Sequence, residues 1–183
     1  MDLKNPDGLD QLGSIIFERW GRLDGLLANA AILGDITPAP HIEPKTFDEL
    51  IAVNLTANYR LIRSVDTLLR KSKAGRAVFL TSGVATSRRA FWGGYAASKA
   101  GLEALVQSYA KEMSITDVKV NLLNPGAART AMRAKAMPGE DPANLPDPAE
   151  LAPLIVDMLS PSYEGHDEIV AFRDTGFYAA KEA

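Results

Sequence analysis

The sequence predicts an α/β fold built around a parallel β-sheet. Three observations lead to this class. Apolar runs of strand length alternate along the chain with longer segments whose apolar residues recur at helical spacing. The apolar runs show little polar alternation, which is typical of strands buried on both faces of a parallel sheet. The chain has 183 residues and 46% hydrophobic content, which is within the range of one domain with a packed core.

The first half of the chain alternates helix, strand and helix. Residues 9–20 have apolar side chains near helical spacing and are followed by a glycine, so they predict an amphipathic helix. Residues 23–28 form a short apolar run, which predicts a buried strand that ends at Asn29. Residues 34–44, with three prolines, predict a loop, and residues 46–71 form the longest periodic segment and predict a long helix.

The second half repeats this alternation. The expected elements are a strand at 78–81, a helix at 94–113, a strand at 118–123, a helix at 148–159 and a last strand at 166–172.

Two loops of the second half are candidates for substrate contact. Residues 131–148 carry four prolines and mixed charge, so we expect them to form a mobile loop that covers a substrate. Phe91 and Trp92 precede the helix at 94–113, where they either wall an apolar pocket or pin the loop. Arg88 and Arg89, in the same loop, are expected to be solvated, with contact to an acidic substrate as the alternative.

Tyr95 and Lys99 form the candidate catalytic pair. Residues four apart lie one above the other on a helix, so a phenol and an ammonium would face one site. A free phenol has a pKa near 10 and exchanges protons poorly near neutrality unless a positive charge favours the phenolate. Ser82, at the carboxyl end of the preceding strand, would bring a hydroxyl to the same place, where open α/β sheets bind ligands.

Five motifs around this pair resemble those of the short-chain dehydrogenase/reductase family. Ser82 lies thirteen residues before Tyr95, small residues surround Lys99, and the segment 124–130 reads Asn-Pro-Gly-Ala-Ala-Arg-Thr. Upstream, residues 26–31 resemble the family's Asn-Asn-Ala-Gly motif, and Val-Asn-Leu around Asn54 resembles its helix-borne asparagine. The motifs occur in the family's order.

The resemblance implies an oxidoreductase that transfers a hydride between NAD or NADP and a small carbonyl or alcohol substrate. Tyr95 would transfer the proton, Ser82 would bond the substrate oxygen, and Lys99 would lower the Tyr95 pKa and hold the ribose hydroxyls. Asn54 would belong to the catalytic set by distorting its helix around a water linked to Lys99. The alternative for Asn54 is a structural hydrogen bond to the backbone.

The resemblance also implies which residues hold the cofactor. They are Asn29, Ala30, Tyr95, Lys99, Pro125, Gly126 and Thr130. A turn-forming asparagine is the alternative for Asn29, and an ordinary turn is the alternative for Pro125 and Gly126.

The glycine-rich part of such a cofactor site is not found. It needs a first strand, a glycine-rich turn that approaches the pyrophosphate, and a helix amino terminus. Here the first helix leads directly into the strand that the family places fourth. We therefore expect a Rossmann-like doubly wound sheet, N-terminally truncated with about the first three strands missing, and the strand at 23–28 as a new edge. The residue that distinguishes NAD from NADP would follow the second strand, so this choice stays open.

Two functional hypotheses follow. The intact set of Ser82, Tyr95 and Lys99 favours an oxidoreductase, either truncated or completed by a segment outside this chain. The missing phosphate loop favours a catalytically silent remnant that acts as an interaction protein. In both cases we expect homo-oligomers formed through the two long helices, at 46–71 and 94–113.

Composition argues against several other classes. The net charge of −3 gives no electrostatic basis for binding nucleic acid or an anionic membrane. There are no cysteines, so disulfides and thiolate metal sites are excluded and no metal site is predicted. No apolar run is long enough to span a bilayer and no secretory signal is recognised, so a cytoplasmic location is expected.

Overall fold

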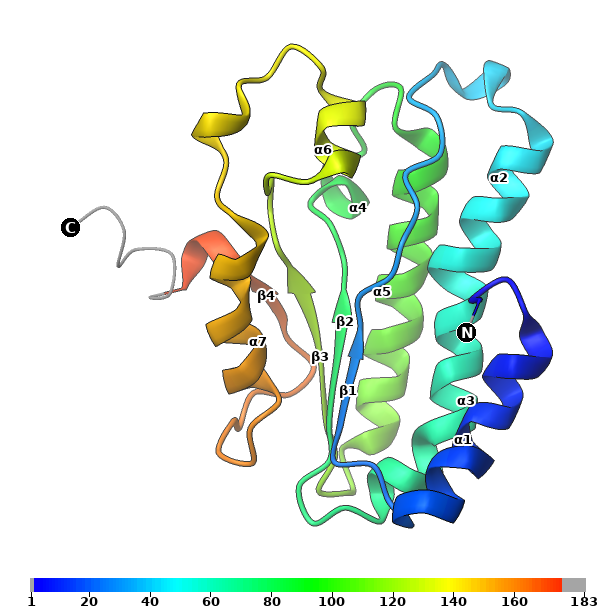
Figure 1. The fold of residues 1–183 in the computed structure, drawn as a ribbon, viewed down its shortest axis with the longest axis vertical. Coiled ribbons are helices and arrows are strands. Elements are labelled where there is room, and N and C mark those ends of the chain that lie inside the picture. Colours follow the sequence, from blue (N-terminus) through cyan, green and yellow to red (C-terminus); the bar gives the residue numbers. More distant parts are fainter. Residues whose placement is uncertain (1, 176–183) are drawn as a thin grey trace.

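The computed structural model of the protein describes residues 2–175. Its centre is one sheet of four parallel strands in the order β1-β2-β3-β4 (Figure 1). The strands are β1 (Gly25–Ala28), β2 (Arg76–Leu80), β3 (Lys119–Asn124) and β4 (Ile169–Ala171). Strands that follow one another in the chain are neighbours in the sheet, so each connection crosses over the sheet through helical segments. The expected parallel α/β class is confirmed.

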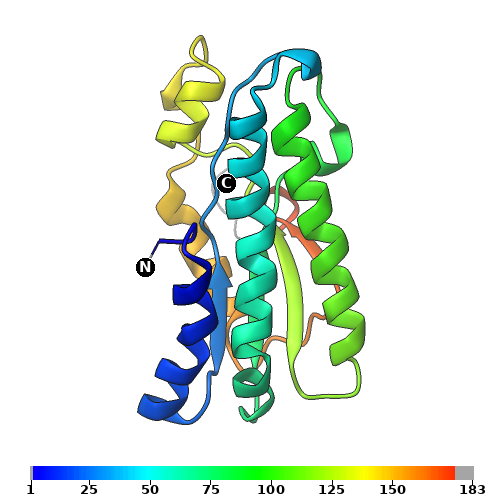
Figure 2. The ribbon, with the colours of Figure 1, turned by 90° about the vertical axis from the view of Figure 1, so that its right-hand side faces the viewer.

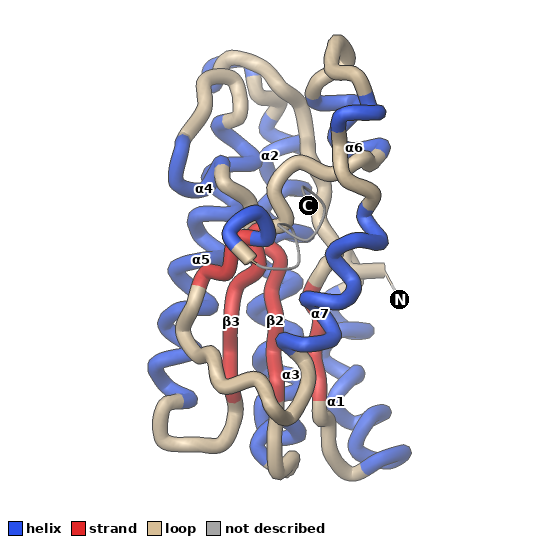
Figure 3. Tube along the Cα trace, turned by 90° about the vertical axis from the view of Figure 1, so that its left-hand side faces the viewer, coloured by secondary structure: helices blue, strands red, loops and turns tan. Residues whose placement is uncertain are grey.

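Helices cover both faces of this sheet. On one face, α1 (Pro6–Trp20), α3 (Ala57–Arg70) and α5 (Gly93–Met113) stand side by side (Figure 2). On the other face, α7 (Ala152–Met158) packs against the sheet (Figure 3). Helix α2 (Pro44–Ile51) extends the line of α3 beyond the carboxyl ends of the strands (Figure 1). The sheet is therefore wound on both sides.

The two central strands carry the core. Phe79 of β2 pairs in register with Leu122 of β3, and both pack among apolar residues of α1, α3 and α5. Their neighbours Val78 and Leu123 point to the opposite face and pack with α7. All four side chains are at most 1% exposed. Burying one such side chain contributes about 1.5–3 kcal/mol, so these strands form a rigid base for whatever lies at their ends.

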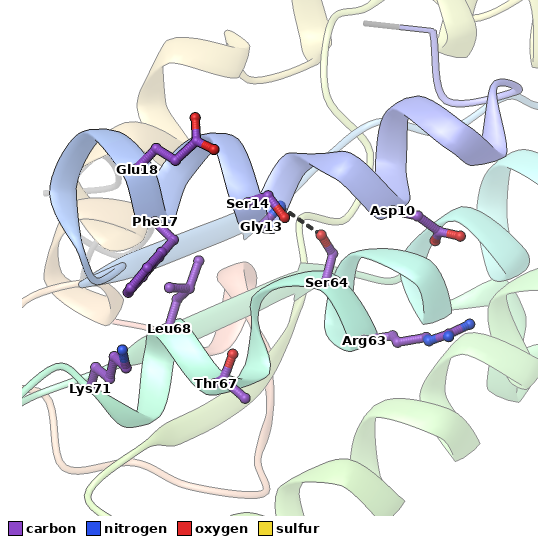
Figure 4. Close-up of a pocket in the computed structure, with 10 residues that line it drawn as sticks. All are labelled: Asp10, Gly13, Ser14, Phe17, Glu18, Arg63, Ser64, Thr67, Leu68 and Lys71. Carbon is purple, nitrogen blue, oxygen red and sulfur yellow. Dashed lines mark hydrogen bonds between the residues drawn. The ribbon is translucent and has the colours of Figure 1, made fainter.

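Helix α1 has clear sequence signals at both ends and in its middle. The Asn5 side chain accepts hydrogen bonds from two backbone N–H groups of the first turn, and Gly21 ends the helix with a φ of 72°. At Gly13 the backbone N–H donates to Ser64 Oγ of α3 at 2.8 Å (Figure 4). A Cβ at Gly13 would overlap the Ser64 carbonyl oxygen, so α1 and α3 can be this close only because position 13 is glycine.

The expected long helix and the expected last strand differ from the structure. The helix predicted at 46–71 is one helical run, but it changes to a π-helical turn at Ala52–Thr56 between α2 and α3. The strand predicted at 166–172 is shorter, because β4 begins only at Ile169. Asp167 has a φ of 59°, which lies outside the extended region and interrupts the strand pattern.

Short helices lie over the carboxyl ends of the strands. They are α4 (Val84–Ser87), after β2, and α6 (Ala131–Ala136), after β3 (Figure 1). The segment 131–148, expected as a loop, thus begins with a helix, and the helix predicted at 148–159 begins as a 3-10 turn at Pro148–Leu151 before α7.

Strand β1 lies at an edge of the sheet, as expected. It pairs only with β2 among residues 2–175. Leu26 packs against the core on the side of α1, whereas Leu27 is 39% exposed. Within the same residues, no helix is both long and apolar enough to cross a membrane.

Candidate active site

A pocket of about 470 Å³ opens at the carboxyl ends of β1, β2 and β3. Its walls come from the segments that follow these strands, from the start of α5, and from α6 and α7. The expected site residues that line it are Asn29, Ala30, Ser82, Tyr95, Lys99, Pro125, Gly126 and Thr130. Asn54 is the expected site residue that is not part of this wall.

Ser82, Tyr95 and Lys99 converge on this pocket from two elements. Ser82 follows the end of β2, and Tyr95 and Lys99 lie one turn apart on α5. The Ser82 hydroxyl lies beside the Tyr95 phenol, close enough to favour its ionised form. Lys99 Nζ donates to the carbonyl oxygen of Leu80 at 2.8 Å and lies 5.9 Å from the centre of the Tyr95 ring. A hydroxyl, a phenol and an ammonium therefore face one small volume.

Burial sets the proton affinities of this pair. The side chains of Tyr95 and Lys99 are almost excluded from solvent, which disfavours the charged form of each. Burial raises the pKa of Tyr95, and the Ser82 hydroxyl opposes this rise. Burial lowers the pKa of Lys99 to about 8, and the charge of Glu103 opposes this fall. The lowered Tyr95 pKa implied by the family resemblance is not observed, because burial outweighs the other effects and the phenol keeps its proton.

Asn54 is fully buried behind the pocket, in the π-helical turn. Its Oδ1 accepts from the Ile32 N–H at 2.9 Å, and its Nδ2 donates to the Ile32 carbonyl at 2.9 Å and to Ser98 Oγ at 3.0 Å. The bonds to Ile32 are the structural hydrogen bonds to the backbone that one alternative for Asn54 predicted. The other alternative predicted a helix distorted at Asn54, and the π-helical turn is such a distortion. The Asn54 carbonyl accepts from Asn58 Nδ2 at 2.9 Å.

The residues that resemble cofactor ligands lie around the mouth of the pocket. Asn29 and Ala30 are exposed directly after β1. Gly126 has a φ of 69°, a conformation that favours glycine, and its N–H donates to Asn124 Oδ1 at 3.0 Å. Thr130 Oγ1 accepts from the Arg133 N–H at 3.1 Å and caps α6. The Pro-Gly turn therefore has the geometry of a tight turn and also forms part of the pocket wall.

The roles of Phe91 and Trp92, left open by the sequence, are separated by the structure. Trp92 is 7% exposed, lines the pocket and packs edge-on against Tyr95 with ring centres 6.1 Å apart. Phe91 is 56% exposed and is absent from the pocket wall. Its backbone carbonyl accepts from the Thr37 N–H at 3.0 Å, and its φ is 71°. Trp92 is the wall residue, and the backbone of Phe91 pins the loop.

Sequence reasoning did not single out the wall residues of α6. Met132, Arg133 and Ala136 of this helix line the pocket. Arg133 forms a bidentate ion pair with Glu140, with N–O distances of 2.5 and 2.7 Å. This ion pair lowers the pKa of the Glu140 carboxyl. Lys135 donates to the Gly34 carbonyl at 3.0 Å, which ties α6 to the segment after β1. A search for helical spacing inside the segment 131–148 could have found these residues.

A second hollow, of about 660 Å³, lies between α1 and α3 on the helical face (Figure 4). Its wall includes the apolar side chains of Phe17 and Leu68 and the charged side chains of Glu18 and Lys71, and Lys71 Nζ lies 4.3 Å from the centre of the Phe17 ring. It shares no lining residue with the pocket at the carboxyl ends of the strands. In residues 2–175 no group of three or more histidine or acidic side chains is arranged to hold a metal ion.

Comparisons with known proteins agree on one family. A family model described as short chain dehydrogenase matches residues 1–141. YciK of Escherichia coli K12, described as an uncharacterized oxidoreductase, is 43% identical over 153 residues, which cover 84% of this chain and 60% of YciK. The 3-oxoacyl-acyl-carrier-protein reductase FabG of Vibrio cholerae is 30% identical over 170 residues, which cover 88% of this chain and 69% of FabG. The chain thus spans about 60% of the length of YciK.

A solved structure shows the same fold. A short chain dehydrogenase from Escherichia coli CFT073, in complex with NADPH, superposes with a TM-score of 0.88 and 38% sequence identity. The superposition covers 93% of this chain and 72% of that protein.

Proposed function

Because the chain belongs to the short-chain dehydrogenase family, we propose that it works as an NAD(P)-dependent oxidoreductase on a small carbonyl or alcohol substrate. The observation that carries this proposal is the convergence of Ser82, Tyr95 and Lys99 in one pocket at the ends of parallel strands. When bound, NAD(P) supplies or accepts the hydride.

The protonated phenol suits Tyr95 to the role of acid in the direction of carbonyl reduction. As a hydride adds to the carbonyl carbon, the Tyr95 O–H proton passes to the carbonyl oxygen, and the phenolate left behind is reprotonated from solvent. Ser82 would donate a hydrogen bond to the same oxygen as negative charge develops on it. Lys99, with a pKa of about 8, is mostly cationic at neutral pH and stabilises the phenolate.

The pocket wall fits the nicotinamide end of such a cofactor. Lys99 offers an ammonium for ribose hydroxyls, Thr130 has a hydroxyl proton to donate, and Gly126 leaves its part of the wall without a side chain. Asn29 and Ala30 would contact the adenosine side. We further propose that the pyrophosphate requires a glycine-rich turn on a strand paired with the free edge of β1.

We propose that residues 131–148 cover the bound substrate. Helix α6 already supplies wall residues, and Lys135 holds it against Gly34 and, at 3.7 Å, against the Asp35 carboxylate. Both contacts are exposed, and exposed ion pairs are worth only about 0–1 kcal/mol, so this attachment is weak enough to open.

One observation favours the second candidate, a catalytically silent protein that acts by self-association. The edge of β1 is unpaired within the described residues and Leu27 beside it is exposed, which is the kind of edge that recruits another chain. Pairing of α2–α3 and α5 with a second copy is the form of homo-oligomer we propose in either case.

The proposed function is tested by following the absorbance of NADPH and NADH while the purified protein is offered ketones and aldehydes of graded size. Consumption of cofactor that depends on both protein and carbonyl compound supports an oxidoreductase. A folded protein that consumes neither cofactor with any compound favours the silent candidate.

A further inference from the structure

The end of β2 and the catalytic face of α5 are joined residue by residue. Lys99 Nζ donates to the Leu80 carbonyl at 2.8 Å, and the Ser82 hydroxyl lies beside the Tyr95 phenol. Residues 80 and 82 therefore each meet one member of the proposed catalytic pair. The residue between them is hydrogen-bonded to the same helix.

Thr81 Oγ1 donates a hydrogen bond of 2.6 Å to Glu103 Oε1. Thr81 is 3% exposed and Glu103 is half-buried, so this bond is largely shielded from water. A hydroxyl bonded to a carboxylate is stronger than a neutral pair, and a shielded bond is costly to break. Three consecutive residues at the strand end thus meet three residues of one helix, two of them through hydrogen bonds.

The three helix residues form one stripe. Tyr95, Lys99 and Glu103 follow one another at intervals of four, so their side chains lie one above the other on the face of α5 that meets β2. Glu103 is the next group along the stripe from the buried ammonium. Its negative charge opposes the fall that burial imposes on the pKa of Lys99.

The groups that Lys99 contacts directly are neutral, and the other charged side chain in the pocket wall is Arg133. On α5 its neighbours in the stripe are the Tyr95 phenol and Glu103, and at the end of β2 it meets the Leu80 carbonyl oxygen. In the π-helical turn, the Asn54 amide donates to Ser98, the residue before Lys99. Among the described residues, Glu103 is the charge that acts on Lys99.

We propose that Glu103 is a positioning residue of this site, which holds the strand end at 80–82 against α5 through Thr81 and supplies the negative charge that faces Lys99. Its effect on catalysis rests on the proposed function, but its effect on Lys99 does not. Thr81 lines the pocket between Leu80 and Ser82, whereas Glu103 does not, so Glu103 acts through Thr81 and Lys99.

Glu103→Gln tests the charge. Glutamine keeps the length of the side chain and an oxygen that accepts from Thr81, and loses only the charge. The measurement is the pKa of Lys99, followed through the side-chain carbon signals of protein labelled at lysine, with the Lys99 signal identified by its loss in Lys99→Met. We expect the Lys99 pKa to fall by at least about half a unit.

Glu112→Gln is the matched control. Glu112 is exposed near the end of the same helix, so the same change of charge there should leave the Lys99 pKa where it is. An equal shift in both variants, or no shift in Glu103→Gln, would overturn the proposal. Neither measurement needs turnover. If the proposed function were wrong, the protein would bind or reduce nothing, but the Lys99 pKa would still fall in Glu103→Gln.

Thr81→Val tests the bond and serves if Glu103→Gln does not fold. Valine keeps the shape of threonine but cannot donate a hydrogen bond to the Glu103 carboxylate. We therefore expect the Lys99 pKa to fall, but by less than in Glu103→Gln. In an active protein kcat should fall about tenfold, with KM nearly unchanged, because alignment rather than binding is lost. Thr81→Ser, which keeps the hydroxyl, should restore both values. A Thr81→Val protein with unchanged Lys99 pKa and kcat would contradict the positioning role.

Discussion

Lys99 Nζ lies 5.9 Å from the centre of the Tyr95 ring, one helical turn away, and is anchored on the Leu80 carbonyl rather than on an acidic side chain. A buried cation thus stands beside a buried phenol without a direct ion pair. Such a cation costs folding free energy and is available to stabilise a phenolate when one forms.

Replacement of Tyr95 by phenylalanine removes the proposed proton donor. We expect Tyr95→Phe to lower turnover by about 10²–10⁴-fold, the usual contribution of general acid catalysis, and to leave the thermal unfolding curve nearly unchanged. Steady-state rates and circular dichroism melting measure the two effects. The matched control is Tyr109→Phe on the same helix, where loss of the 2.9 Å hydrogen bond to Asp66 should cost about 1 kcal/mol of stability and leave the rate intact. Wild-type turnover in Tyr95→Phe would exclude the mechanism.

Lys99 should lower the stability of the fold at neutral pH. Its pKa is lowered from 10.5 to about 8, so the unfolded chain binds more protons than the native protein between these values. The free energy of unfolding therefore increases as the pH rises from about 8 to about 10.5. Below pH 8 the buried ammonium of Lys99 lowers the free energy of unfolding by its full amount, about 3 kcal/mol.

The variant Lys99→Met removes this cost and also the bond to Leu80. We expect it to be about 1–2 kcal/mol more stable than the wild type at pH 7, and this advantage to shrink by pH 9.5. Urea unfolding at the two pH values makes the measurement. If the stability of Lys99→Met relative to the wild type instead increased with pH, the lowered pKa of Lys99 would be refuted.

Asn54 should be a main support of the segment after β1. Asn54→Ala leaves the Ile32 backbone groups and the Ser98 hydroxyl without their buried partner. We expect the free energy of unfolding to fall by about 2–4 kcal/mol, since each buried unpaired group costs about 1–3 kcal/mol. The exposed Asn144, replaced in the same way, should change stability by less than about 0.5 kcal/mol. Similar effects in the two variants would contradict the role assigned to the Asn54 side chain.

The contact of α1 with α3 should tolerate no side chain at position 13. Gly13→Ala would press a methyl group into the Ser64 carbonyl and force the helices apart, at a cost of about 1–3 kcal/mol. Gly139→Ala is the control, because no atom lies within 4 Å of a Cβ built there. Denaturant midpoints of the two variants give the comparison, and equal midpoints would show that α1 can move away from α3 without cost.

The sequence predicts best those features that depend on local spacing. The four-residue interval between Tyr95 and Lys99 predicts that they share a helix face, and the position of Ser82 after an apolar run predicts that it lies at a strand end. Both follow from the geometry of single elements and hold in the structure. Gly21 likewise marks the end of α1, because a left-handed residue there favours glycine.

The features that the sequence does not predict depend on contacts between elements. The bond of Thr81 to Glu103 joins residues 22 positions apart, and nothing in either segment alone predicts it. The raised pKa of Tyr95 depends on how deeply packing buries the phenol, which spacing does not reveal. The late start of the predicted last strand depends on one residue, Asp167, whose φ of 59° lies outside the extended region.

The central claim, that the pocket at the ends of β1, β2 and β3 serves a nicotinamide cofactor, is tested most directly by calorimetric titration of the full chain with NADPH and with NADH. The solution mass of the same sample shows whether a second copy is present. We predict saturable binding of at least one of the two, weakened in Lys99→Met. A folded protein that binds neither cofactor would contradict the claim and would leave Ser82, Tyr95 and Lys99 as an inherited arrangement in an interaction protein.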